Sequence, residues 1–325
     1  MSLYTVRGSA ELDARIRADM KQIAEVTAPH SLAGVLIGGY GRGEGTPFIK
    51  PNGSQEPFND YDLVVVVDRL TGKVRETFRR LERELSGKVG LPVDLCPYHA
   101  AHLRRCAFSL LNYEMKYGHR VIWGADDILA ALPAYPHDGI PLPEGTRLLL
   151  NRGKLLLDMQ RRLTDPAPLS GEERIRFIKF IHKVLLAFGD CALLAAGQYD
   201  ISYTVKKMRF TAIGHCPERD YIVEGYRRAI DLKNWGDFES MARLDIAAEV
   251  EILRKVYLKF MPWYRTQHHG SEGTPLKNII LNLKWNRRLS AHHPREALYD
   301  LITELLENGA PASIDRFYRL QQRFS

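Results

Sequence analysis

Cysteines and long apolar runs are both scarce in this sequence. Its 325 residues include four cysteines, widely spaced and without a C-x-x-C pair, which predicts a reduced, cytoplasmic protein with buried or inert thiols. The longest apolar runs, at 63–67 and 191–196, are far shorter than the roughly 18–20 residues that a membrane span needs. The N-terminal stretch holds no continuous apolar segment typical of a secretory signal. We therefore expect a cytoplasmic protein without a membrane segment.

Internal repeats and low-complexity segments are also absent, and the composition is that of a globular protein. Hydrophobic residues make up 45% and charged residues 26% of the chain, whose length suits two domains. The segment 133–145 holds four prolines and two glycines, which is typical of a linker. We therefore predict one domain over 1–135 and a second over 146–325.

The hydrophobic pattern differs between these two parts. Before the linker, short apolar runs at 32–37, 63–67 and 92–96 predict strands, and three- and four-residue spacing predicts helices at 10–28, 71–86, 100–117 and 125–132. The stretch GTPFIKPNGSQEPFN between them is typical of a long loop. After the linker only helical periodicity is present, at 146–163, 171–197, 217–233, 236–262, 275–288, 294–308 and 312–323. The predicted fold class is α+β, a mixed sheet with helices followed by an α-helical domain.

Positive charge is concentrated in the second part. The first 135 residues hold 17 Lys and Arg against 16 Asp and Glu, and the remainder holds 29 against 23. This excess favours an anionic partner for the helical domain, although a solvated basic surface would produce the same count.

Two carboxylates open the most apolar strand. Asp60 and Asp62 flank Tyr61 immediately before the run 63–67, and residues two apart in an extended chain project from the same face. Like charges held this close repel each other, and a divalent cation would neutralise both. The alternative is that Asp60 ends a loop and Asp62 caps a turn.

A glycine-rich turn precedes this pair. Gly38, Gly39 and Gly41 follow a predicted strand, where glycines let the backbone approach a phosphate chain, and Arg42 could pair with a phosphate oxygen. A dinucleotide-binding fold does not fit the context, because Gly45 leads into the predicted loop and not into a crossover helix.

A third carboxylate lies in the next short strand. Asp94 stands alone among apolar residues in the sequence LPVDL. If its strand neighbours 63–67, Asp94 completes a metal site or accepts a proton from an attacking hydroxyl. A turn or edge aspartate is the alternative.

Together these motifs resemble the DNA polymerase β-type nucleotidyltransferase superfamily, over about the first 135 residues. The stretch GGYGRGEG is especially similar to bacterial uridylyltransferases of nitrogen signalling. The resemblance implies that Gly38 and Gly39 hold a triphosphate and that Asp60 and Asp62 bind Mg²⁺ or Mn²⁺. It implies that Asp94 shares a metal and serves as base while a hydroxyl attacks the α-phosphate of an NTP.

Two features depart from the family pattern. Twenty residues separate Gly39 from Asp60, which predicts an insertion over 46–58 beside the site. Tyr40 stands where many members carry a serine, so we name Tyr40, with Arg42, as a candidate contact to the nucleotide without assigning its side-chain interaction.

The helical domain offers basic candidates for the nucleotide or the acceptor. Lys183 interrupts an apolar neighbourhood, and Tyr203 and Lys206 belong to a dense polar and basic group. We name all three as candidate triphosphate contacts, with a lysine that extends its head to solvent as the alternative. The spacing His99-x-x-His102 suits a metal but lacks an obvious third ligand, and Trp285 among cations could stack on a base or belong to a core.

The expected function is Mg²⁺-dependent transfer of an NMP from an NTP to a hydroxyl, with a small-molecule acceptor favoured by the modest chain length. Cyclic or linear oligonucleotide synthesis is the second enzymatic reading, and nucleic acid is a less favoured partner because no dedicated DNA-binding motif is present. A non-catalytic nucleotide-binding regulator is the alternative from another class.

Overall fold

A computed structural model describes residues 2–50, 52–236, 243–268, 274–286, 289–309 and 311–324. The chain divides into two compact units, and they are not consecutive. The first contains Met1–Ile140 together with Asp200–Lys206 and Ile230–Ala242, and the second contains the remaining segments. The expected α+β class is confirmed: a four-stranded mixed sheet with helices lies in the first unit and helices follow. Among the described residues no helix is long and apolar enough to cross a membrane.

The sheet has the order β5-β4-β1-β6. Its strands are β1 (Ala33–Leu36), β4 (Tyr61–Val67), β5 (Val93–His99) and β6 (Arg120–Trp123). Strand β1 pairs antiparallel with β4 and β6, whereas β4 and β5 are parallel. Helix α3 (Gly72–Val89) is the crossover that connects the two parallel strands. Because these strands are parallel, both begin at the same edge of the sheet.

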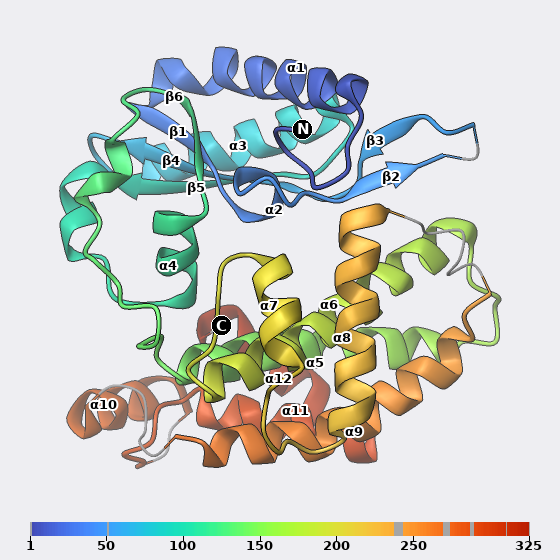
Figure 1. Ribbon diagram of the computed structural model, residues 1–325. Coiled ribbons are helices and arrows are strands. Elements are labelled where there is room, and N and C mark those ends of the chain that lie inside the picture. The colour runs from blue at the N-terminus through green and yellow to red at the C-terminus, as the bar shows by residue number, and fades with distance from the viewer. Residues whose placement is uncertain are drawn as a thin grey trace. The chain divides into compact units, whose positions relative to one another are not determined.

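Strand β4 is buried on both faces, as its run of β-branched residues predicts. One face packs with α1 (Ala10–Thr27) and α3, and the other with α4 (Leu110–Tyr117) and the 3₁₀ helices η2 (Ala100–Arg105) and η3 (Ile128–Ala131) (Figure 1). Alternate residues supply the two cores: Tyr61, Leu63, Val65 and Val67 to the first, Val64 and Val66 to the second.

Two predicted helices of this unit are shorter than expected. The segment 100–117 is divided, because Cys106 is extended and Ser109 caps a new helix by accepting a hydrogen bond from Asn112 N at 3.1 Å. The segment 125–132 holds only the 3₁₀ turn η3.

The predicted long loop contains a hairpin. Strands β2 (Pro47–Ile49) and β3 (Gln55–Pro57) pair antiparallel, and Gly53 N donates to Lys50 O at 2.8 Å in the turn. The sequence hides this pair because each strand has three residues and a proline, whereas Gly53, at φ +81°, provides the turn. The prediction of a long loop over this stretch is therefore wrong in part.

The second unit is built from helices around an aromatic core. The helices α5 (Pro143–Leu163), α6 (Gly171–Ala195) and α9 (Ile246–Thr266) pack on one another, with Phe188, Tyr257 and Phe260 fully buried. The unit also holds α10 (Pro275–Asn286), α11 (Glu296–Asn308) and α12 (Pro311–Phe324), and it shares α7 (Tyr203–Phe210) and α8 (Arg219–Trp235) with the first unit. Helix α9 begins later than predicted, because Asp245 caps it by accepting from Ala248 N.

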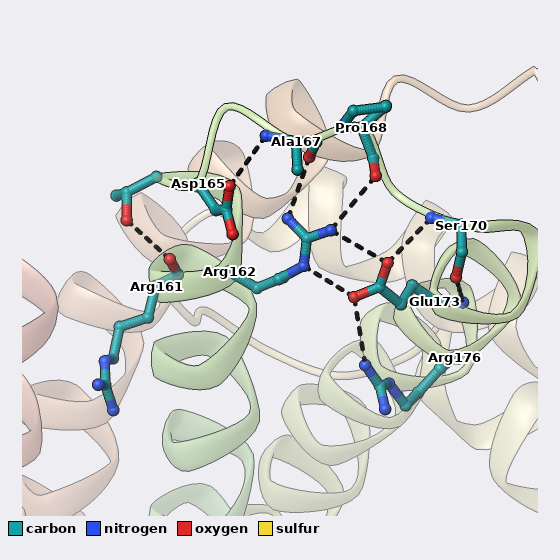
Figure 2. Close-up of polar contacts among 9 residues, drawn as sticks. Arg161, Arg162, Asp165, Ala167, Pro168, Ser170, Glu173 and Arg176 are labelled. Carbon is teal, nitrogen blue, oxygen red and sulfur yellow. Dashed lines mark hydrogen bonds and ion pairs between the residues drawn. The ribbon is translucent and has the colours of Figure 1, made fainter.

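One ion pair fixes the connection between α5 and α6. Arg162 donates to both carboxylate oxygens of Glu173, at 2.7 and 3.1 Å, and to the carbonyl oxygens of Ala167 and Pro168 (Figure 2). Glu173 also accepts from Ser170 N, which completes the capping box at the start of α6. These hydrogen bonds, with that of Arg162 first, lower the pKa of the Glu173 carboxyl to about 2.

Candidate functional site

The three predicted carboxylates meet at the edge where β4 and β5 begin. Asp62 and Asp94 are partners in the parallel register, and Asp60 precedes β4 by one residue. One oxygen of each of the three lies within 4.8 Å of those of the other two. Asp60 and Asp62 are half-buried and Asp94 is exposed. The group could therefore hold a metal ion through three oxygen ligands, which suits a hard divalent cation.

Tyr61 holds the strand end in this orientation. It lies between the two aspartates and, by strand alternation, points to the opposite face, where its hydroxyl donates to Asp19 on α1 at 2.8 Å. Arg15 donates to the same carboxylate at 2.9 Å. Burial, followed by the charge of Asp19, raises the pKa of the Tyr61 phenol. This fixed, neutral phenol directs Asp60 and Asp62 to the other face.

The glycine pair lies directly against the carboxylates. Gly38 opens the short helix α2 (Gly38–Gly41) with φ +65°, and a Cβ atom there would lie 2.8 Å from Asp62 Oδ2. A Cβ atom on Gly39 would lie 3.0 Å from the Nζ atom of Lys233 on α8. A side chain at Gly38 would be strained and one at Gly39 would be crowded, and the turn brings backbone, carboxylate and ammonium groups together.

Glu44 joins this turn to α7. Its carboxylate accepts from Ser202 Oγ at 2.7 Å and from Tyr203 N at 3.0 Å, the groups at the start of α7. The glutamate is 7% exposed, so these hydrogen bonds are shielded from water. Two predicted residues, Tyr203 and Lys206, thereby belong to the same compact unit as the carboxylates, although the sequence assigns them to the helical domain.

Cations surround the ring of Tyr203. The Nζ atoms of Lys206 and Lys233 lie 4.1 and 5.3 Å from its centroid, and the guanidinium carbon of Arg42 lies 5.2 Å away. Lys206 is completely buried. This concentration of ammonium groups behind the glycine turn favours an anion there.

Arg42 is held by two carboxylates of the protein. Its side chain is 7% exposed and pairs with Glu44 at 3.3 Å and with Glu114 at 3.4 Å. Two carboxylates already share its charge, so in this structure Arg42 organises the turn. The prediction that it binds a phosphate directly is not supported by these contacts.

Tyr40 is likewise engaged within the protein. Its hydroxyl donates to Thr46 O at 3.0 Å and accepts from Phe58 N at 2.9 Å and Asn59 N at 3.3 Å. Burial raises the pKa of this phenol. Tyr40 therefore ties both ends of the β2–β3 hairpin to the glycine turn. These hydrogen bonds hold the ends of the predicted insertion, 46–58, in place. The predicted contact of Tyr40 with the nucleotide stays a prediction.

Lys183 lies half-buried on α6 in the second unit, and its triphosphate contact stays a prediction. His99 and His102 have ring centroids 4.5 Å apart and line a cavity of about 430 Å³ away from the carboxylates. The side chain of Trp285 lies outside the described residues.

Sequence reasoning missed Glu44 and Lys233. Glu44 lies within the stretch GGYGRGEG, and its negative charge two residues after Arg42 is the available signal. Lys233 lies in the last turn of an ordinary amphipathic helix, and nothing in its local sequence points to Gly39. Known protein families and curated proteins gave no match to this sequence.

Proposed function

We propose that the first unit is a divalent-metal-dependent nucleotidyltransferase that moves an NMP from an NTP to a hydroxyl acceptor and releases pyrophosphate. The observation that carries this proposal is the meeting of Asp60, Asp62 and Asp94 within 4.8 Å beside a glycine turn that the half-buried Lys233 approaches.

Three oxygen donors of this kind fit Mg²⁺ or Mn²⁺, which would be held by Asp60, Asp62 and Asp94. When bound, the ion supplies Lewis-acid stabilisation of the charge that develops on the phosphate oxygens. The carboxylates orient the reacting groups, and Gly38 and Gly39 place no side chain between their backbone and the carboxylates. Lys206 and Lys233 offset the charge of the triphosphate.

The reaction needs one bond to form and one to break. The acceptor oxygen bonds to the α-phosphorus while the bond from that phosphorus to the bridging oxygen of the β-phosphate breaks, and pyrophosphate leaves. Asp94 is the exposed member of the three, so it is the carboxylate that an acceptor hydroxyl can reach and to which it can give its proton.

A binding and turnover experiment tests this function. Each NTP is titrated into the purified protein with Mg²⁺ or Mn²⁺ by calorimetry, and slow pyrophosphate release is followed in parallel. The test variant is Asp60→Asn/Asp62→Asn. The matched control is Asp68→Asn, which removes an 82% exposed carboxylate at the far end of the same strand.

We expect metal-dependent NTP binding and pyrophosphate release in the wild type and in the control Asp68→Asn. Both should be lost in the double variant. NTP binding without pyrophosphate release, with either metal and also after a small-molecule extract is added as a source of acceptor, would favour a regulatory nucleotide sensor. Equal behaviour of the wild type and the double variant would overturn the proposal.

A further inference from the structure

A hollow lies beside Asp94 on the outer side of the sheet. Its volume is about 330 Å³, and it is lined by Arg75, Arg79 and Glu82 of α3 and by residues 94–97 of β5. This volume is at the lower end of the range for small-molecule sites. The hollow includes the carboxylate that an acceptor hydroxyl would meet, so its lining bears on which acceptor fits.

The edge position of β5 explains how α3 reaches this hollow. Strand β5 pairs with β4 on one side only, and the opposite backbone groups need other partners. Glu82 Oε1 accepts from Leu95 N at 2.8 Å, and Ser86 Oγ accepts from Val93 N at 2.9 Å. These bonds fix α3 along the edge and place Arg75 and Arg79, on successive turns, at the mouth of the hollow.

The hollow is lined by two cationic and two anionic side chains. Arg75 and Arg79 are positive, and Glu82 and Asp94 are negative. The Glu82 carboxylate is engaged by the β5 backbone, and the charge of Asp94 would be shared with the cation of the proposed site. The pair between Arg79 and Glu76 joins side chains that are each 66% exposed, and such pairs contribute about 0–1 kcal/mol, so Glu76 does little to hold Arg79. An anion that enters therefore meets the guanidinium groups of Arg75 and Arg79, beside carboxylates that are engaged by the β5 backbone and, in the proposed complex, by a cation.

We propose that the acceptor is a small anionic alcohol, bound through its phosphate or carboxylate group by Arg75 and Arg79 with its hydroxyl next to Asp94. Two guanidinium groups one turn apart match planar or tetrahedral oxyanions better than they match a neutral polyol. This assignment rests on the proposed function, because it interprets the hollow as the acceptor side of the nucleotidyl-transfer site. The small volume favours a compact compound over a nucleic-acid strand.

Cys96 gives a readout of binding that needs no turnover. This residue lines the hollow and is exposed, whereas the half-buried Cys106 lies in a different cavity. Alkylation of each cysteine by neutral iodoacetamide is followed by peptide mass spectrometry with Mg²⁺ present. Glycerol, glycerol 3-phosphate and glycerate are added at constant ionic strength, and Cys106 serves as the internal control.

The expected result is that glycerol 3-phosphate or glycerate slows Cys96 alkylation by about threefold or more at millimolar concentration, in line with a weak probe. Glycerol has no effect, and comparison of the two anions separates phosphate from carboxylate recognition. Arg75→Ala/Arg79→Ala loses the protection, and the matched variant Arg80→Ala/Arg83→Ala keeps it. Absent protection, or equal protection in Arg75→Ala/Arg79→Ala, would overturn the assignment.

A transfer assay distinguishes a failure of the acceptor assignment from a failure of the proposed nucleotidyltransferase function. A small-molecule extract is split by anion exchange, and each fraction is incubated with labelled NTP. Both proposals are supported if label enters a small compound of the retained fraction and this labelling depends on Asp60 and Asp62. The labelling should also fall at least about tenfold in Arg75→Ala/Arg79→Ala. Carboxylate-dependent labelling of an unretained compound or of an oligonucleotide overturns the anionic small acceptor alone. Unchanged NTP binding in Asp60→Asn/Asp62→Asn overturns the function and the acceptor together.

Discussion

Asp62 and Asp94 lie directly opposite each other in the parallel register of β4 and β5. The alignment of these strands brings a carboxylate from each side of α3 to one edge of the sheet. Their exposures differ, since Asp62 is half-buried against Gly38 while Asp94 faces the outer hollow. The two residues therefore have different expected roles, one in holding the cation and one in receiving the acceptor.

Replacing Asp94 should separate binding from chemistry. In Asp94→Asn the two half-buried carboxylates still hold a cation, so we expect NTP affinity to change little. The rate of transfer should fall by about 10²–10⁴-fold, the usual contribution of a general base. Calorimetry and single-turnover kinetics measure the two quantities. An Asp94→Asn protein with wild-type turnover would exclude Asp94 as the proton acceptor.

Gly38→Ala should disturb Asp62 directly. Gly38 has φ +65°, where an L side chain costs about 1–2 kcal/mol, and the new Cβ atom would lie 2.8 Å from Asp62 Oδ2. We expect a lower free energy of unfolding in urea and weaker metal-dependent NTP binding. Gly72→Ala is the control, because nothing lies within 4 Å of a Cβ atom there. Equal NTP affinity of Gly38→Ala and wild type would contradict the close packing that we describe.

Local patterns in the sequence were sufficient for three strands of the sheet, β1, β4 and β5, and for the carboxylates. The run after Asp62 predicts a strand buried on both faces, and the spacing of Asp60 and Asp62 follows from strand geometry. Asp94 could be recognised because it interrupts an apolar strand. These features depend on a few neighbouring residues, so periodicity is enough to find them.

Local patterns could not predict contacts between residues that are far apart in the sequence. Glu44 meets Tyr203 across 159 positions of sequence, and Lys233 approaches Gly39 through the end of α8. The return of residues 200–206 to the first unit depends on these pairings, and no composition change marks it. The structural role of Tyr40 was missed for the same reason, since its hydroxyl partners flank a hairpin that the sequence does not reveal.

Tyr40→Phe tests whether this phenol is structural. The substitution removes one acceptor shared by Phe58 N and Asn59 N and the donor to Thr46 O, and leaves buried backbone groups without that partner. We expect the free energy of unfolding to fall by about 1–3 kcal/mol. NTP affinity, measured in parallel at a temperature where both proteins are folded, should stay within about twofold. A large loss of affinity without a loss of stability would restore Tyr40 as a nucleotide contact.

The Arg162–Glu173 pair should make stability depend on acid pH. The pKa of Glu173 is lowered to about 2 in the folded protein, below the ordinary value of 4.5. Its ionised carboxylate therefore stabilises the fold above pH 4.5, and this contribution is lost as the pH falls from 4.5 toward 2. We expect Glu173→Gln to be less stable than wild type near neutral pH, with a difference that narrows in acid. Urea unfolding across this range measures it, with Glu172→Gln as the control for charge.

Glu44→Gln should loosen the connection between the glycine turn and α7. The variant replaces a buried carboxylate with an amide, which pairs less strongly with Arg42 and presents an NH₂ group to the donors Ser202 Oγ and Tyr203 N. Hydrogen bonds to charged groups contribute about 1.5–3 kcal/mol, and we expect a loss of stability of that size.

Glu114→Gln is the matched control, since Glu114 pairs with the same arginine at 3.4 Å but is 23% exposed, and it should lose less. The decisive readout is the KM for NTP, because a displaced α7 moves Tyr203 and Lys206 away from the turn. A raised KM in Glu44→Gln, with Glu114→Gln close to wild type, would place Glu44 as the positioning residue for the buried lysine. Equal KM values in both variants would mean that Glu44 stabilises the fold without contributing to nucleotide binding.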